Sequence, residues 1–139
     1  MSRVLRCHPG IGPKVEGEAL VASDNFSARY DLDRIKGVFS RPAHKLFGEC
    51  YRDKILVLNT AKGGVASAWM LREMLQSGVT PKALVFNTVN TILAQGAAFA
   101  GLTMVDRFDC ADVTQEINSG DLIEVDPVEG YVRISTRSR

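Results

Sequence analysis

Hydrophobic positions along the chain fall into short runs separated by glycine, proline and polar residues. Two continuous apolar runs, Ile55–Leu58 and Ala83–Phe86, are typical of strands that are covered on both faces. Each run leads into polar residues and then into a helical pattern, which predicts helices over Val65–Ser77 and Thr91–Ala100. This alternation of strands and helices predicts an α/β fold with parallel strands.

Alternating residues and turn signals predict further elements on either side of this unit. They are strands at Val15–Ala22, Phe26–Tyr30, Thr103–Val105, Leu122–Val125 and Tyr131–Ser135, and a helix over Asp112–Ser119. The last two strands flank Asp126–Gly130, which indicates a terminal hairpin. The sequence therefore predicts a mixed sheet, part parallel and part antiparallel, with flanking helices.

The length of the chain, 139 residues, suits one domain with a core and is too short for two. The turn signals HPG and IGP precede the first predicted strand, so we expect an N-terminal arm over residues 1–14 and a single domain over 15–139. The stretch between Asp31 and Asp53 lacks clear periodicity, which is unusual unless it wraps a surface or serves a site.

Composition excludes several classes of function. Hydrophobic residues make up 45% of the chain and charged residues 24%, as in ordinary globular proteins, and the net charge of +1 gives no sign of a nucleic-acid partner. No apolar run approaches the roughly 20 residues of a membrane helix, and no signal peptide is recognisable, so we expect a cytoplasmic protein. Three widely spaced cysteines without a CxxC pair argue against a metal site held by this chain alone.

The junction Asn59–Ser67 is the first candidate for chemistry. A buried strand that runs through glycines into a helix presents backbone N–H groups to a carboxylate or phosphate. The candidate substrate-binding residues are Lys62, Gly63, Gly64, Val65 and Ala66. The glycines allow close approach and the lysine adds a positive charge. The alternative is an ordinary strand–helix turn with a solvated lysine, and the spacing matches no nucleotide-binding motif.

Two residues of the predicted helix that follows have a possible role. Ser67 lies in the apolar arc of a helical wheel. It is either a candidate catalytic hydroxyl or a buried hydroxyl bonded to the first turn. Trp69 lies among the polar residues, where an exposed indole is costly unless another protein covers it. We therefore expect Trp69 at a partner interface.

A second polar junction follows the next buried strand. Because ligands of open α/β sheets gather beyond the carboxyl ends of strands, Asn87 and Asn90 are candidate substrate-binding residues in the same crevice. The alternative is helix capping by Asn90 or Thr88. His44, in the segment HKLFGE, is a further candidate or else a surface histidine, and Asp106 and Arg107 form a possible local ion pair.

Several blocks of the sequence resemble the small subunit, or swivel domain, of the aconitase X family. The blocks are Gly17–Val21, His44–Glu49, Lys54–Val57, Ile92–Asp109 and Ile117–Ile134, in one order across Val15–Ile134. The resemblance implies a swivelling β/β/α fold and a large partner subunit that carries an iron–sulfur cluster. This chain alone is expected to bind no cofactor.

The resemblance also implies a hydro-lyase. An archaeal type of the family acts on mevalonate 5-phosphate, and a bacterial type converts cis-3-hydroxy-L-proline to Δ1-pyrroline-2-carboxylate. In the archaeal type the turn reads Gly-Arg-Gly-Ser-Ser, and its first serine is taken as the proton acceptor; here Gly64 stands at that position. Ser67 is the nearest hydroxyl, about 4–5 Å further along a helix axis, which leaves either Ser67 or a group of the large subunit as the base.

Loss of the arginine and both serines removes groups suited to a phosphate, so the sequence favours the hydroxyproline type of substrate. Two alternatives stay open, namely a mevalonate 5-phosphate dehydratase subunit and a non-catalytic module that binds a small acid without a partner.

Overall fold

The computed structural model describes residues 3–23, 32–33, 37–40, 45–60, 78, 81–88, 102–110 and 112–136. Within these ranges the elements are strands β1 (Arg3–Arg6), β2 (Val15–Val21), β3 (Leu32–Asp33), β4 (Val38–Phe39), β5 (Ile55–Thr60), β6 (Ala83–Thr88), β7 (Thr103–Val105), β8 (Leu122–Asp126) and β9 (Tyr131–Thr136), and helix α4 (Val113–Glu116).

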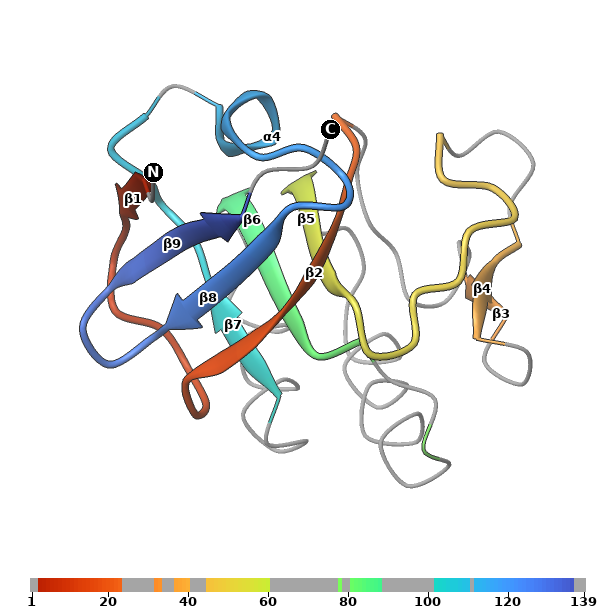
Figure 1. The fold of residues 1–139 in the computed structure, drawn as a ribbon, viewed down its shortest axis with the longest axis horizontal. Coiled ribbons are helices and arrows are strands. Elements are labelled where there is room, and N and C mark those ends of the chain that lie inside the picture. Colours follow the sequence, from red (N-terminus) through yellow and green to blue (C-terminus); the bar gives the residue numbers. More distant parts are fainter. Residues whose placement is uncertain are drawn as a thin grey trace.

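Seven of these strands form one mixed sheet in the order β1-β9-β8-β2-β5-β6-β7. Strands β2, β5, β6 and β7 run parallel to one another, whereas β8, β9 and β1 continue the sheet in antiparallel fashion. Figure 1 shows the parallel strands β5 and β6 ending beneath α4. The mixed sheet and the terminal β8–β9 hairpin confirm the sequence prediction.

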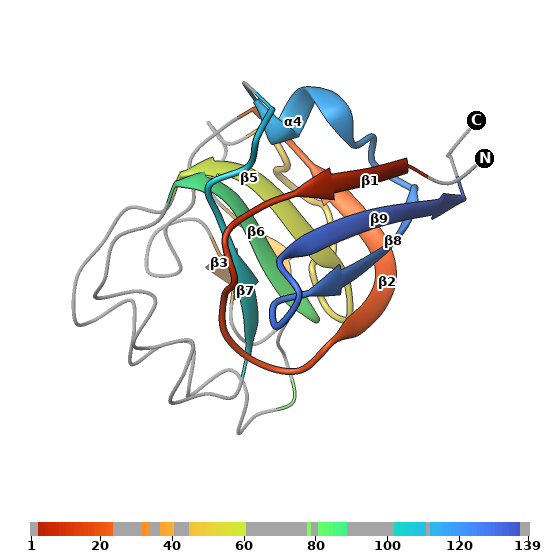
Figure 2. The same cartoon turned by 90° about the vertical axis from the view of Figure 1, so that its left-hand side faces the viewer.

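The expected N-terminal arm is replaced in part by a strand, because Arg3–Arg6 pair with β9 as β1. The segment that follows, residues 7–13, runs from β1 to the opposite edge of the sheet, and we call it the strap (Figure 2). Its Ile11 exchanges backbone hydrogen bonds with Met104 of β7, at 2.9 and 3.0 Å. The sheet is therefore curled, and the strap links its first strand to its last.

The hydrophobic core explains why the strands form where they do. Ile55, Val57, Ala83 and Val85 belong to one cluster of buried residues, to which α4 contributes Val113. The alternate positions of β5 and β6 are buried as well, namely Leu56, Leu58, Leu84 and Phe86. Both faces of β5 and β6 are therefore covered, as the continuous apolar runs predicted.

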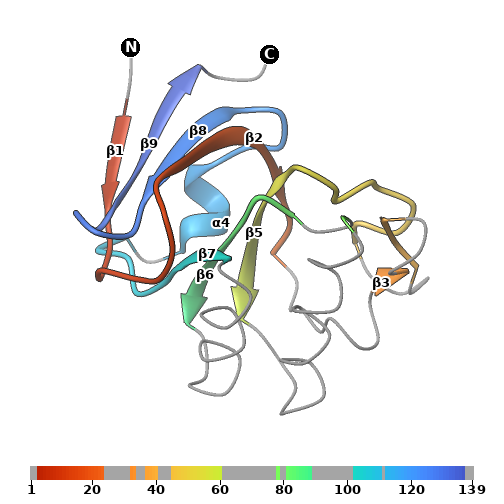
Figure 3. The same ribbon diagram turned by 90° about the horizontal axis from the view of Figure 1, so that it is seen from below.

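A two-stranded sheet formed by β3 and β4 lies on the side of β5 away from β1 and β9 (Figures 1 and 3). Phe39 of β4 packs edge-on against Tyr51, with ring centroids 6.0 Å apart. The Phe39 amide also donates to the carbonyl oxygen of Glu49 at 3.0 Å. The irregular region of the sequence thus contains a small packed unit of its own.

The flanking helices expected from the sequence are not confirmed. In the part of the chain that the structure describes, α4 is the one helix, and it spans Val113–Glu116 where the sequence predicted Asp112–Ser119. It ends early because Ile117 adopts extended backbone angles, after which the Asp121 carboxylate accepts from the Asn118 amide at 2.9 Å. The helices predicted over 65–77 and 91–100, and the strand over 26–30, lie outside the described residues.

Candidate functional site

The carboxyl ends of β5 and β6 form a polar edge above the apolar core. Thr60 and Thr88 are cross-strand neighbours at the ends of the two strands. The Thr60 hydroxyl donates to the Thr88 carbonyl oxygen at 2.9 Å, and the two hydroxyl groups lie 3.4 Å apart. Both strands of the predicted site therefore end at one place, as expected for ligand-binding edges of parallel sheets.

The Asn87 side chain lies at the centre of this edge. Its Nδ2 group donates to Oδ1 of Asn59 at 3.1 Å and to Oδ1 of Asp112 at 2.9 Å. Its own Oδ1 accepts from the backbone amide of Val113 at 2.8 Å. One half-buried amide thus joins β5, β6 and the start of α4.

Asp112 is the N-cap of α4. Its Oδ1 accepts from the backbone amide of Thr114 at 3.0 Å and from the Thr114 hydroxyl at 2.7 Å, besides the bond from Asn87. The hydrogen bond from Asn87, followed by those from Thr114, holds the pKa of the Asp112 carboxyl below its ordinary value of 3.8. The group is therefore a carboxylate at neutral pH.

The end of β7 adds a charged pair to the same region. Arg107 has a left-handed backbone angle, φ of 61°, and its amide donates to the Asn87 carbonyl oxygen at 2.9 Å. Its side chain lies 3.8 Å from the Asp106 carboxylate, which confirms the predicted local ion pair. The Arg107 side chain is 63% exposed, so the pair contributes little to stability.

Most of the predicted site residues lie outside the described residues. These are Lys62, Gly63, Gly64, Val65, Ala66, Ser67, Trp69, Asn90 and His44. Asn87 is described, and it lies at the polar edge where the sequence placed it, although a contact with substrate stays a prediction. The structure brings Asn87 together with Asn59, Thr60 and Thr88. The ends of the two predicted junctions therefore lie next to each other.

Asp112 was missed as a member of this edge. The sequence carries a local signal, because Asp followed by Val-Thr-Gln-Glu is a typical helix start. Nothing local predicts that this cap meets Asn87, which lies 25 residues earlier in the chain.

The described part of the chain shows neither a cluster of metal ligands nor a helix that could span a membrane. Among the described residues, no three His, Cys, Asp or Glu side chains gather as metal ligands would. Helices in the described part of the chain are all too short or too polar to cross a membrane.

The described residues form a curled mixed sheet with a polar edge where its parallel strands end. The chain belongs to the aconitase X family: residues 4–134 match the family model described as "Aconitase X swivel domain". This match includes most of β1 and the whole strap, so the resemblance first seen from Val15 onward extends further toward the N-terminus.

Named relatives are similar over nearly their whole length. The phosphomevalonate dehydratase small subunit of Thermococcus sibiricus is 38% identical over 123 residues, covering 88% of this chain and 92% of that protein. The protein of the same name from Methanococcoides burtonii is 34% identical over 122 residues, with 88% of each chain covered.

Two solved structures share the fold. Aconitase X of Thermococcus kodakaraensis, in its holo-form, superposes with a TM-score of 0.87 at 26% identity, covering 95% of this chain and 98% of that one. The solution structure of a protein named UPF0107 gives a TM-score of 0.85 at 29% identity, with the same coverage.

Proposed function

We propose that this chain is the small subunit of an aconitase X-type dehydratase, a hydro-lyase that removes water from a hydroxy acid in the cytoplasm. The observation that carries the proposal is the family match over residues 4–134, supported by relatives named as dehydratase small subunits that cover 88% of the chain. The word "small" in these names supports a larger partner subunit for this chain as well.

The site would be built beyond the polar edge of β5 and β6. Thr60 and Thr88 end these strands side by side, so the segments 61–67 and 89–90 leave the sheet from neighbouring points. We propose that Lys62 and the backbone N–H groups of Gly63–Ala66 bind the substrate carboxylate, with Asn90 and His44 as further contacts. Ser67 is the proposed proton acceptor of this chain, and Trp69 the proposed contact with the large subunit.

An iron–sulfur cluster, in this proposal, belongs to the large subunit. This placement rests on the three cysteines of this chain, which are widely spaced in the sequence and include no CxxC pair. No step of the proposed reaction is assigned to a cluster in this chain.

For the substrate we propose cis-3-hydroxy-L-proline. Loss of the α-proton to a base and of the 3-hydroxyl as water gives an enamine, which tautomerises to Δ1-pyrroline-2-carboxylate. The argument rests on the sequence Ala61–Val65, which has lost the arginine and both serines of the phosphate-binding type. A ring carboxylate needs one anion site, which glycine N–H groups and Lys62 can supply.

Mevalonate 5-phosphate is the second candidate substrate. The observation that favours it is the name shared by both relatives described above, which is phosphomevalonate dehydratase small subunit. In this case Lys62 would hold the phosphate, so charge at that position would matter more than for hydroxyproline.

Co-expression with the large subunit, followed by assay of both acids for loss of water, tests the proposal. Turnover of hydroxyproline supports it, and turnover of mevalonate 5-phosphate alone would move the assignment to the second candidate. Binding of a small acid by the purified small chain, with no turnover in the complex, would identify a stand-alone binding module instead. Ser67→Ala should lower kcat about 100-fold or more if Ser67 is the base, with Ser135→Ala, on an exposed strand position, as the matched control.

A further inference from the structure

We propose that Asn87 is a positioning residue, whose amide holds the ends of β5 and β6 and the start of α4 together beneath the proposed site. The inference rests on the proposed function, because it concerns the same site. Its observation is the set of bonds from one amide to three residues: Asn59 on β5, Asp112 before α4, and Val113 within α4.

The bonds of the Asn87 amide give it a structural role. An asparagine amide has two N–H donors, and here they are used at 3.1 and 2.9 Å. The bond to Asp112 is part-buried, so breaking it would leave a partly buried carboxylate without one of its partners. The bond to Asn59 is exposed and contributes less.

We call the hydrogen bonds of the Asn87 side chain to Asn59, Asp112 and Val113 the clamp. The position of Asn87 in the chain indicates what the clamp controls. Asn59 and Asn87 are each one residue from the end of their strands, which stop at Thr60 and Thr88. The segments proposed to bind substrate begin directly after these two threonines. A displacement of about 1 Å in such segments costs on the order of 100-fold in rate. Loosening the strand ends should therefore lower kcat more than it changes KM.

The clamp can be broken from either side, or kept without its charge. In Asn87→Asp a second carboxylate faces Asp112, and the donor between them is lost. Asp112→Ala removes the acceptor instead. All three bonds to residue 112 use Oδ1, so in Asp112→Asn the same oxygen can still accept from Asn87 and cap α4.

Asp112→Ala separates positioning from substrate binding, because it breaks the clamp at a residue that is not among the proposed substrate contacts. We expect Asn87→Asp to lower kcat of the assembled enzyme at least about tenfold, with KM changed less than about threefold. Asp112→Ala should lower kcat in the same way. Asp112→Asn, which keeps the acceptor, should retain kcat to within about threefold of the wild-type enzyme.

The control variant is Thr103→Val, at the opposite end of the parallel strands. The buried Thr103 hydroxyl donates to the Pro13 carbonyl oxygen at 2.5 Å, so this isosteric change also removes one internal hydrogen bond. It should lower Tm and leave kcat unchanged. Full activity of Asn87→Asp well below its Tm would overturn the inference, and so would an Asp112→Ala variant with a lowered Tm and an unchanged kcat.

Thermal unfolding of the full chain keeps the test independent of the substrate assignment. If the wild-type complex turned over neither acid, the proposed function would fail. The coupling of Asn87 to Asp112 would still be judged by Tm, which should fall in Asn87→Asp and in Asp112→Ala. In the double variant Asn87→Asp/Asp112→Ala the fall should be smaller than the sum of the two single losses. Additive losses in Tm would show that the clamp is absent, whatever the substrate.

Discussion

Gly130 and Cys7 join the terminal hairpin to the strap by a close backbone contact. The Cys7 amide donates to the Gly130 carbonyl oxygen at 3.0 Å, and a Cβ added at Gly130 would lie 2.7 Å from the Cys7 carbonyl oxygen. Gly130 also has a left-handed backbone angle, φ of 76°, which other residues adopt only with strain. The position therefore requires glycine for two independent reasons.

We expect Gly130→Ala to lower the free energy of unfolding by about 3 kcal/mol, from backbone strain and from displacement of the strap. Urea denaturation of the full chain measures the change. Gly48→Ala is the matched control, because Gly48 also has a positive φ, 85°, but an added Cβ there would meet nothing within 4 Å. It should cost about 1 kcal/mol. Equal losses in the two variants would mean that the strap contact adds nothing.

Strands were the part of the fold that the sequence predicted best. The apolar run Ile55–Leu58 marks the buried part of β5, but the ladder continues to Thr60, which pairs with Thr88. Hydropathy cannot detect this extension, because backbone hydrogen bonding does not require apolar side chains. The same limit hid β1, whose four residues are fixed by pairing with β9 at the other end of the chain.

For the candidate site, the sequence predicted the place better than the partners. A polar Asn87 after a buried strand pointed to the carboxyl edge of the sheet, where the structure has it. Its bond to Asp112 depends on how α4 packs over β6, and that is a property of the folded chain. Local pattern therefore identifies which junction carries polar groups, whereas only tertiary structure identifies which groups are already engaged.

Ser119 takes the place of a neighbouring strand at the end of β2. Its hydroxyl accepts from the Val21 amide at 2.8 Å and lies 3.3 Å from the Val21 carbonyl oxygen. Ser119→Ala should lower the free energy of unfolding by about 1 kcal/mol and speed hydrogen exchange of the Val21 amide. The matched control is Ser135→Ala, at an exposed position of β9. Unchanged exchange at Val21 would contradict this role.

Cys7 and Cys50 should differ in their reaction with a thiol reagent at about pH 8. Cys50 is exposed, whereas Cys7 is half-buried and has a pKa raised to about 12, first by burial and then by Asp106 and Asp109. Because the thiolate is the reactive form, Cys50 should be modified first and Cys7 only on unfolding. Peptide mass spectrometry after timed labelling measures the order. Labelling of Cys7 as fast as Cys50 would contradict the prediction, and Cys50→Ser provides the control for assigning the fast phase.

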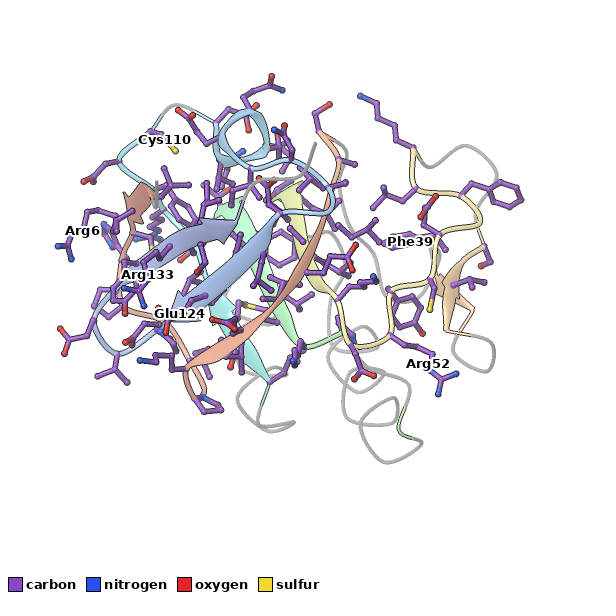
Figure 4. All side chains as sticks on the ribbon, viewed as in Figure 1. Arg6, Phe39, Arg52, Cys110, Glu124 and Arg133 are labelled. Carbon is purple, nitrogen blue, oxygen red and sulfur yellow. The ribbon has the colours of Figure 1, made fainter. Side chains whose placement is uncertain are left out.

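Glu124 on β8 should make stability depend on pH more than any exposed carboxylate does. Its largely buried side chain is paired with Arg133, which lies beside it (Figure 4). It is also paired with Lys14, at 3.3 Å. Burial raises its pKa, but the hydrogen bonds from Lys14 and Arg133 outweigh burial and hold the pKa below its ordinary value of 4.5. A depressed pKa means that the unfolded chain takes up the proton more readily, so this stabilisation is present above pH 4.5 and is lost as the pH falls through the lower, folded value.

Glu124→Gln should therefore be less stable than wild type at about pH 7, and the difference should shrink below pH 4.5. The control Glu18→Gln, in the exposed pair with Lys54, should have little effect at any pH. Chemical denaturation at several pH values measures the free energy of unfolding of both variants. A difference between Glu124→Gln and wild type that stays constant with pH would contradict the role of Glu124 in the pH dependence of stability.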